Sequence, residues 1–203
     1  MILVFSLEYA TMPHMQIEFE LRILNIDKQA LVKKLEALGA TKVHDEVLQR
    51  RYIMDFPDGR LGKQHAWVRV RKVGDLRVEC TLKQRLDNTA IKNAQEIEFE
   101  VSDFDRIVEF LEFLGLQKIG YKENFRLRYH FEGATLDIDT FPQLNPYLEI
   151  EGLSEEHVHS VGYKLGFNDN DFVYKAGKEL FLDLGISLEQ QRDLRFTNHA
   201  DHR

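Results

Sequence analysis

Acidic and apolar residues alternate in the run Glu18-Phe19-Glu20-Leu21-Arg22. In a β-strand successive side chains point to opposite faces, so Glu18, Glu20 and Arg22 are expected on one face. Two carboxylates about 7 Å apart on a strand face can hold a hard divalent cation, and a guanidinium beside them can bind an anion. The run therefore predicts a strand that places a metal ion next to an anionic ligand.

The same alternation recurs in six other segments. In each of them the charged residues share one face and the apolar residues the other. The polar face carries Trp67, Arg69, Arg71; Arg77, Glu79, Thr81, Lys83; Glu96, Glu98, Glu100; Arg126, Arg128, His130; Thr135, Asp137, Asp139; and Glu149, Glu151. The opposite face is almost purely apolar, so we expect helices to cover it.

A one-sided sheet with its polar face in water would also produce this pattern. Cross-strand ion pairs would then account for the charges, at roughly a few tenths of a kcal/mol each. Two features favour an enclosed face instead. Glu and Arg dominate it, and Arg is preferred where phosphate or carboxylate is bound in a planar, forked geometry. The signs are also segregated, because segments 65–73 and 125–131 carry only bases and 96–101 and 147–152 only acids.

Turn and capping signals predict the elements that position these side chains. Asp27, Asp103 and Ser154 are suited to begin helices that stop near Gly39, Gly115 and Gly166, and a final helix is expected over 171–184. Strands are expected at about 15–24, 41–54, 65–73, 76–84, 95–101, 118–131, 134–141 and 147–152. This order predicts an α+β fold, with an eight-stranded antiparallel β-barrel, a polar charged lumen and helices packed outside.

Composition limits the class of protein. The 203 residues carry a net charge of −7, with 34 acids and 27 bases, which argues against a nucleic-acid binder. Cys80 is the single cysteine, so we expect a cytoplasmic protein, and no apolar run approaches a membrane span. We expect residues 1–14 to be a loose arm or a mis-assigned start, 15–185 to form the domain, and 186–203 to form a mobile tail.

In chain order, these motifs resemble the CYTH superfamily, also called triphosphate tunnel metalloenzymes. The family's acid-x-acid-x-Lys strand resembles Glu18-Phe19-Glu20-Leu21-Arg22, and its paired arginines resemble Arg69 and Arg71. The remaining matches are Thr81-Leu82-Lys83, Glu96-Ile97-Glu98-Phe99-Glu100, Arg126-Leu127-Arg128, Asp139-Thr140-Phe141-Pro142 and Leu148-Glu149-Ile150-Glu151. The resemblance covers roughly residues 15–185 and implies an eight-stranded tunnel that binds a triphosphate with Mg²⁺ or Mn²⁺.

The resemblance also implies roles for individual residues. Its metal ligands would be Glu18, Glu20, Glu149 and Glu151, with Glu98 and Asp139 as helpers, and Glu18, Glu20 and Glu151 would be catalytic. Its triphosphate clamp would be Arg22, Arg69, Arg71, Lys83, Arg126 and Arg128. Two departures stand out. Arg22 replaces the usual Lys, and Arg50 takes the place of an acid two residues before Tyr52.

Several functions remain open on this basis. The leading hypothesis is hydrolysis of an inorganic or organic triphosphate such as tripolyphosphate, ATP or thiamine triphosphate. Cyclisation of ATP to cyclic AMP is the second, for which Trp67 is the candidate base-stacking residue, although a plug at a barrel end is favoured for it. A non-catalytic binder of polyphosphate or nucleotide and an inert scaffold are the third and fourth. A homodimer is left open, with neither nucleic acid nor membrane as partner.

Overall fold

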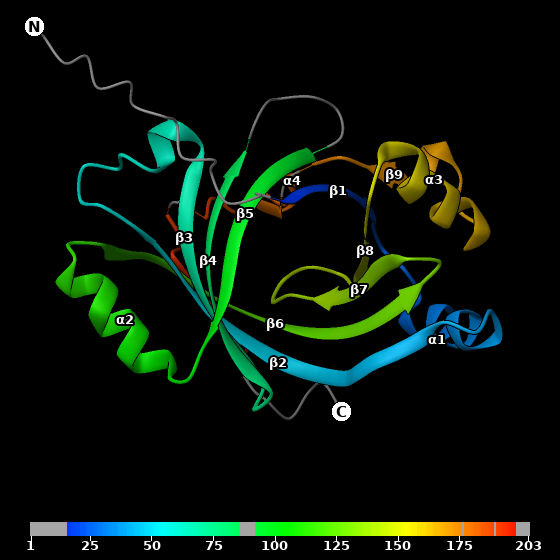
Figure 1. The fold of residues 1–203 in the computed structure, drawn as a ribbon. Helices are drawn as coiled ribbons and strands as arrows, with labels where there is room; N and C mark the ends of the chain where they lie inside the picture. Colours follow the sequence, from blue (N-terminus) through cyan, green and yellow to red (C-terminus); the bar gives the residue numbers. More distant parts are fainter. Residues whose placement is uncertain (1–15, 86–91, 176, 189, 198–203) are drawn as a thin grey trace, which may run out of the picture.

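Ten strands form one sheet in the computed structural model, which describes residues 16–85, 92–175, 177–188 and 190–197. The eight longer strands are β1 (Gln16–Ile23), β2 (Thr41–Asp55), β3 (Ala66–Val73), β4 (Arg77–Arg85), β5 (Lys92–Val101), β6 (Gln117–Phe131), β7 (Ala134–Thr140) and β8 (Tyr147–Gly152). They pair in the order β6-β2-β3-β4-β5-β1-β8-β7, and an additional pairing of β7 with β6 joins the two ends. The pairing of these strands thus runs round a ring (Figure 1).

Three of the helices lie outside this ring, as the sequence predicts. Figure 1 shows α2 (Phe104–Phe113) on one side and α1 (Lys28–Ala37) with α3 (Glu155–Lys164) on the opposite side. Asp27, Asp103 and Ser154 cap these helices by accepting backbone hydrogen bonds, which confirms the predicted helix starts. Each helix is followed by a glycine at positive φ, where a side chain would strain the backbone.

The apolar faces of the strands point outward into two of the three clusters of buried side chains. One cluster packs β1, β6, β7 and β8 against α1 and α3, with Leu21, Tyr129 and Leu148 fully buried. A second packs β2, β3 and β4 against α2 around Met54 and Val70. The cover is incomplete, however, because Phe99 on the outer face of β5 is 52% exposed. The charged faces of most strands are consequently left to point into the ring.

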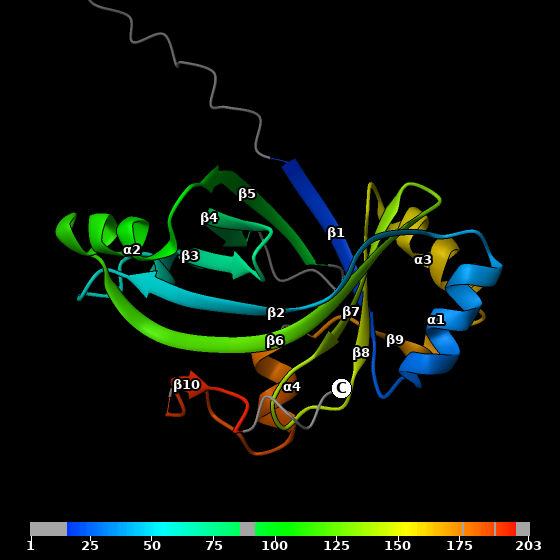
Figure 2. The ribbon, with the colours of Figure 1, turned by 90° about the horizontal axis from the view of Figure 1, so that it is seen from below.

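Three expectations differ from the structure. The sheet has ten strands instead of eight, because β9 (Phe172–Val173) adds to β1 and β10 (Asp193–Leu194) adds to β6. The helix expected over 171–184 is confined to α4 (Gly177–Asp183), since a 3₁₀ turn and β9 use the residues before it. The described part of the expected mobile tail packs on the barrel beside α4 (Figure 2), with Leu194 buried. The predicted arm at 1–14 lies outside the described residues.

Candidate functional site

A cavity of about 760 Å³ opens among the charged faces of the strands. Among the described residues, ten lysines and arginines line it against six acids. They are Arg22, Arg51, Arg69, Arg71, Lys83, Arg85, Lys122, Arg126, Arg128 and Lys178, with Glu20, Asp55, Glu96, Glu98, Glu149 and Glu151. The predicted charged lumen is therefore present, and its lining is more basic than the chain as a whole.

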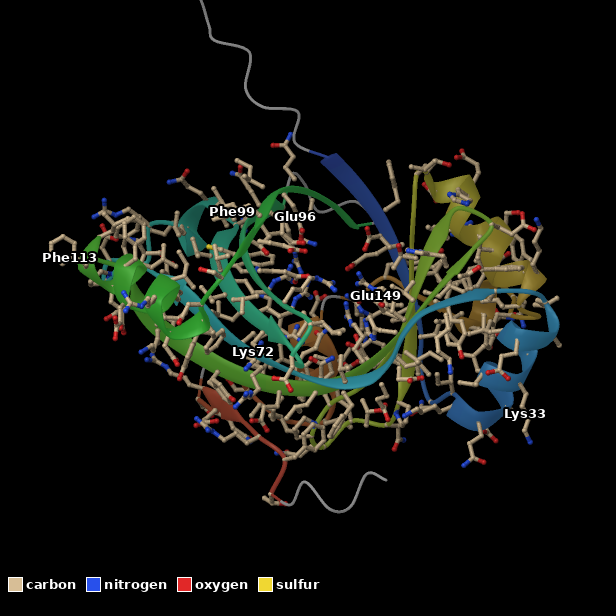
Figure 3. All side chains as sticks on the ribbon, turned by 60° about the horizontal axis from the view of Figure 1, so that its bottom comes forward. Lys33, Lys72, Glu96, Phe99, Phe113 and Glu149 are labelled. Atoms are coloured by element: carbon tan, nitrogen blue, oxygen red, sulfur yellow. The ribbon has the colours of Figure 1, made fainter. Side chains whose placement is uncertain are left out.

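Strands β1 and β8 supply an acidic wall to this cavity. Glu20 lies opposite Glu151 in the pairing of the two strands, and Arg22 lies opposite Glu149. Arg22 bridges two of these acids, with its Nη2 2.9 Å from Glu20 Oε1 and 2.5 Å from Glu149 Oε2. In Figure 3 Glu149 lies in the middle of the molecule amid nitrogen-bearing side chains, whereas Lys33 and Phe113 lie at its periphery. The wall is thus held together by a buried guanidinium.

The pKa values of Arg22 and Glu149 reflect that arrangement. Burial disfavours charge on Arg22, but Glu149 and Glu20 beside it raise the pKa of the guanidinium above its ordinary value. Burial would likewise raise the pKa of Glu149, but Arg22 and Arg126 hold it well below the usual range for a carboxyl. Both groups are therefore charged at neutral pH, and each neutralises the other.

Strands β6 and β7 supply a basic wall whose charges are also partnered. Arg126 donates to both carboxylate oxygens of Asp139, at 2.8 and 2.5 Å, and lies 2.5 Å from Asp137. Arg128 makes a forked pair with Asp137, with both distances at 2.7 Å. Asp139 is fully buried behind Arg126 and does not line the cavity. The structure thus places this predicted metal helper where it orients an arginine.

Strands β3, β4 and β5 complete the ring with a third set of ion pairs. Arg71 Nε donates to Glu79 Oε2 at 2.6 Å, and Arg69 Nη2 lies 3.2 Å from Glu98 Oε2. Lys83 pairs with Glu96. Burial would raise the pKa of Glu79, but Arg71 and Arg77 lower it to about 2. Burial first, and then Arg69, lower the pKa of Arg71 to about 10.

Four further basic residues line the cavity, and the sequence analysis missed all of them: Arg51, Arg85, Lys122 and Lys178. Arg51 on β2 lies opposite Lys122 on β6. Arg51 Nη2 donates to Gln49 Oε1 at 3.0 Å and to Asn124 Oδ1, which are neutral acceptors. Sorting 41–54 by parity would have found Arg51, which shares a face with Gln49 and Ile53. Arg50, named as a departure from the family pattern, is exposed on the outer face and does not line the cavity.

The acids suit a divalent metal ion in ligand type, since hard cations prefer carboxylate oxygens. Glu20, Glu149 and Glu151 lie on paired strands and all line the cavity. Within the described parts of the chain, however, no three acidic, histidine or cysteine side chains are already grouped to hold a metal ion. Arg22 bonds to both Glu20 and Glu149 and occupies oxygens that an ion would use. The side chain of Glu18 lies outside the described residues.

The remaining sequence candidates take simple positions. Trp67 lines the cavity and is half-buried, on the face shared with Arg69 and Arg71. Cys80 packs in the core cluster under α2, and burial raises the pKa of its thiol. His157 bonds to the backbone of Leu153 and Glu132, outside the cavity lining. Only Trp67 of these three can therefore contact a ligand in the cavity.

None of the described helices is both long and apolar enough to cross a membrane. No curated protein matches the chain. Several solved structures share its fold, although all those described here are less than 25% identical to it.

A conserved hypothetical protein from Pyrococcus furiosus has a TM-score of 0.67 and 24% identity, over 80% of this chain and 99% of that protein. A putative adenylate cyclase from Vibrio parahaemolyticus has a TM-score of 0.72 and 14% identity, over 82% and 98%. A putative adenylyl cyclase from Hippeastrum, described as having a dominant triphosphatase activity, has a TM-score of 0.60 and 20% identity, over 88% and 100%. The model of the CYTH domain matches residues 16–176, and the chain accordingly belongs to the CYTH domain family.

Proposed function

We propose that this protein is a metal-dependent enzyme that binds a triphosphate in the barrel cavity and hydrolyses it. One observation carries the proposal: a wall of carboxylates on β1 and β8 and the arginines and lysines of β2, β3, β4 and β6 line a single cavity. A triphosphate bound with a divalent ion needs both kinds of wall, because arginine forks match its oxygens and carboxylates match the ion.

The basic residues bind and orient the triphosphate in this proposal. Arg69, Arg71 and Lys83 extend from neighbouring strands, and each pairs with an acid that holds it in place. Arg126 and Arg128 are fixed by Asp137 and Asp139 in the same way. Donors that are positioned before the substrate arrives stabilise the charge that develops on phosphoryl oxygens without further reorganisation.

The acidic residues would hold Mg²⁺ or Mn²⁺, with Glu20, Glu149 and Glu151 as ligands and Glu18 beside them on β1. Such an ion, when bound, lowers the pKa of water and neutralises phosphoryl charge. Arg22 links the two walls, because the guanidinium that bonds to Glu20 and Glu149 is also a phosphate-binding group. Its transfer to a phosphate oxygen frees the two carboxylates. Water then attacks a terminal phosphorus, the P–O bond to the leaving diphosphate breaks, and orthophosphate is released.

Phosphate release tests this function. Purified protein is incubated with tripolyphosphate, ATP and thiamine triphosphate in Mg²⁺ or Mn²⁺. We expect metal-dependent release from at least one substrate, and a loss of at least about a hundredfold in Glu151→Gln and Glu20→Gln. Glu109→Gln on the exposed face of α2 is the control. Full activity in the two cavity variants, or release in EDTA equal to that in metal, would refute the metal assignment.

Cyclisation of ATP is a second candidate, because Trp67 lies in the cavity lining and can stack on a base. In that reaction the ribose 3′-hydroxyl attacks the α-phosphorus and diphosphate leaves. Chromatography of the ATP reaction separates cyclic AMP from ADP and AMP. Cyclic AMP as the main product, reduced in Trp67→Ala with tripolyphosphate hydrolysis unchanged, would favour the cyclase.

A further inference from the structure

Arg51 and Lys122 form a pair of like charges inside the cavity. They lie directly opposite each other on β2 and β6, and both line the cavity. Like charges directly opposite on neighbouring strands destabilise a sheet, and burial strengthens that repulsion. A pair of this kind is expected only where something else on the same face compensates for it.

The surrounding side chains provide little compensation. Arg51 is 8% exposed, and its Nε is buried without a hydrogen-bond partner in the part of the chain that the structure describes. Arg71, Arg126 and Arg69 act on Arg51 most strongly among the charged residues, and Asp139, which favours its charge, is already bound by Arg126 through both oxygens. As a result, burial and then these arginines lower the pKa of Arg51 to about 9.

Lys122 likewise has little compensation for its charge. Burial and then Arg51 lower the pKa of its ammonium to about 8, and no described acid forms an ion pair with it. The six bases of the predicted triphosphate clamp differ, since each of them pairs with at least one carboxylate. Arg51 and Lys122 therefore place two positive charges opposite each other on the cavity wall, with no described carboxylate in an ion pair with either of them.

Apolar side chains also line the cavity near this pair. Phe141 packs against the Arg51 guanidinium at 5.5 Å, and its ring meets Phe181 of α4 at 6.0 Å. Ile53 and Ile119 line the cavity from the same two strands as Arg51 and Lys122. Apolar side chains offer a metal ion no ligand. They do lower the local dielectric constant, which strengthens the attraction between an anion and the two cations.

We infer that Arg51 and Lys122 form an additional anion subsite that takes a fourth phosphoryl group, so that the cavity prefers linear tetraphosphates or longer chains to triphosphates. This inference rests on the proposed function. Arg51 lies within electrostatic reach of Arg69, Arg71 and Arg126, so the subsite continues the predicted clamp. A fourth phosphoryl group reaching it would supply the acceptor that Arg51 Nε lacks.

Isothermal titration calorimetry with tripolyphosphate and tetrapolyphosphate tests the subsite, in EDTA and in Mg²⁺ at constant ionic strength. Adenosine 5′-tetraphosphate is a third ligand, and shows whether the fourth phosphoryl group can carry an organic substituent. We expect tetrapolyphosphate to bind at least about tenfold tighter than tripolyphosphate, as one charge-assisted contact would provide. Lys122→Gln and Arg51→Gln should reduce this ratio to near one, while tripolyphosphate affinity changes less than about threefold.

Arg50→Gln is the matched control, because it removes the same charge from the next residue of β2 on the outer face. It should leave both affinities unchanged. Equal binding of the two polyphosphates by the unaltered protein would overturn the inference, and so would a Lys122→Gln variant that loses affinity for both ligands equally. Both results leave the proposed function intact. If neither polyphosphate binds in either buffer, the proposed function fails together with the subsite.

Discussion

Replacement of Lys122 by Met should make the ligand-free protein more stable. The pKa of Lys122 falls from an ordinary 10.5 to about 8 in the folded chain, first because of burial and then because of Arg51. Each unit of pKa difference corresponds to about 1.4 kcal/mol, so the charged ammonium costs up to about 3 kcal/mol of folding free energy at pH 7. Met keeps most of the aliphatic stem and removes the charge. We expect a gain of roughly 1–3 kcal/mol.

The stability gained by Lys122→Met should depend on pH. Below pH 8 both the folded and the unfolded chain carry the Lys122 proton, and the full cost is present. Between pH 8 and 10.5 the unfolded chain holds a proton that the folded chain has lost. The cost to the unaltered protein therefore fades as pH rises through this window. The advantage of Lys122→Met should be largest at pH 7 and should shrink by pH 10.

Urea unfolding of the ligand-free protein at pH 7 and pH 10 measures both effects. Lys33→Met on the exposed side of α1 is the control, because Lys and Met have similar helix propensities and no cavity charge changes. Saturating tetrapolyphosphate should reverse the order of stability, since only the unaltered protein keeps both cations of the subsite. A variant that is less stable than the unaltered protein at pH 7 would show that the ammonium is already compensated, and the reasoning about the cavity charge would be wrong.

Three other substitutions test the remaining walls of the cavity. Asp139→Asn should destabilise the protein by about 1.5–3 kcal/mol in urea, because Arg126 loses charge-assisted hydrogen bonds to Asp139 but keeps its pair with Asp137; unchanged unfolding would contradict the structural role of Asp139. Arg22→Gln should tighten Mn²⁺ binding, measured by electron paramagnetic resonance without phosphate, since it frees Glu20 and Glu149; weaker Mn²⁺ binding would contradict the bridge. Glu79 contributes stability above pH 4.5 that is lost as pH falls toward about 2, so Glu79→Gln should flatten acid unfolding in that range; an unchanged acid limb would contradict the Arg71 and Arg77 pairing.

Most of the fold follows from local signals in the sequence. The caps at Asp27, Asp103 and Ser154 satisfy backbone groups of their own helices, so they need no tertiary information. Strict alternation of polar and apolar residues also predicts which side chains of most barrel strands face the lumen, because the strand period of two is fixed. The position of the C-terminal segment does not follow from local signals. Leu194 is buried only because β10 pairs with β6, some 70 residues earlier, and no local pattern encodes that pairing.

The site illustrates the same limit at the level of single residues. Parity indicates that Arg22 and Glu149 face inward, but the bridge from Arg22 to Glu20 and Glu149 depends on the pairing of β1 with β8. The inward position of Arg51 is more difficult to predict, since Arg50 beside it is equally basic and points outward. The pairing of β2 with β6 shifts register at three places, so the partner of Arg51 cannot be counted from the ends of the two strands.

Arg51 and Lys122 are the most informative part of the site. Ion pairs such as Arg126 with Asp139 hold a barrel together whether or not a ligand is bound, so they do not by themselves indicate one. Arg51 opposite Lys122 is expected to weaken the ligand-free fold, because Arg51 has only the neutral acceptors Gln49 and Asn124 as hydrogen-bond partners and no ion pair with a described acid. A protein keeps such a pair where an anion completes it, because residues that bind ligands are often suboptimal for stability. The two unpaired cations, which face each other, therefore argue for a bound polyanion more strongly than the six partnered cations of the predicted clamp do.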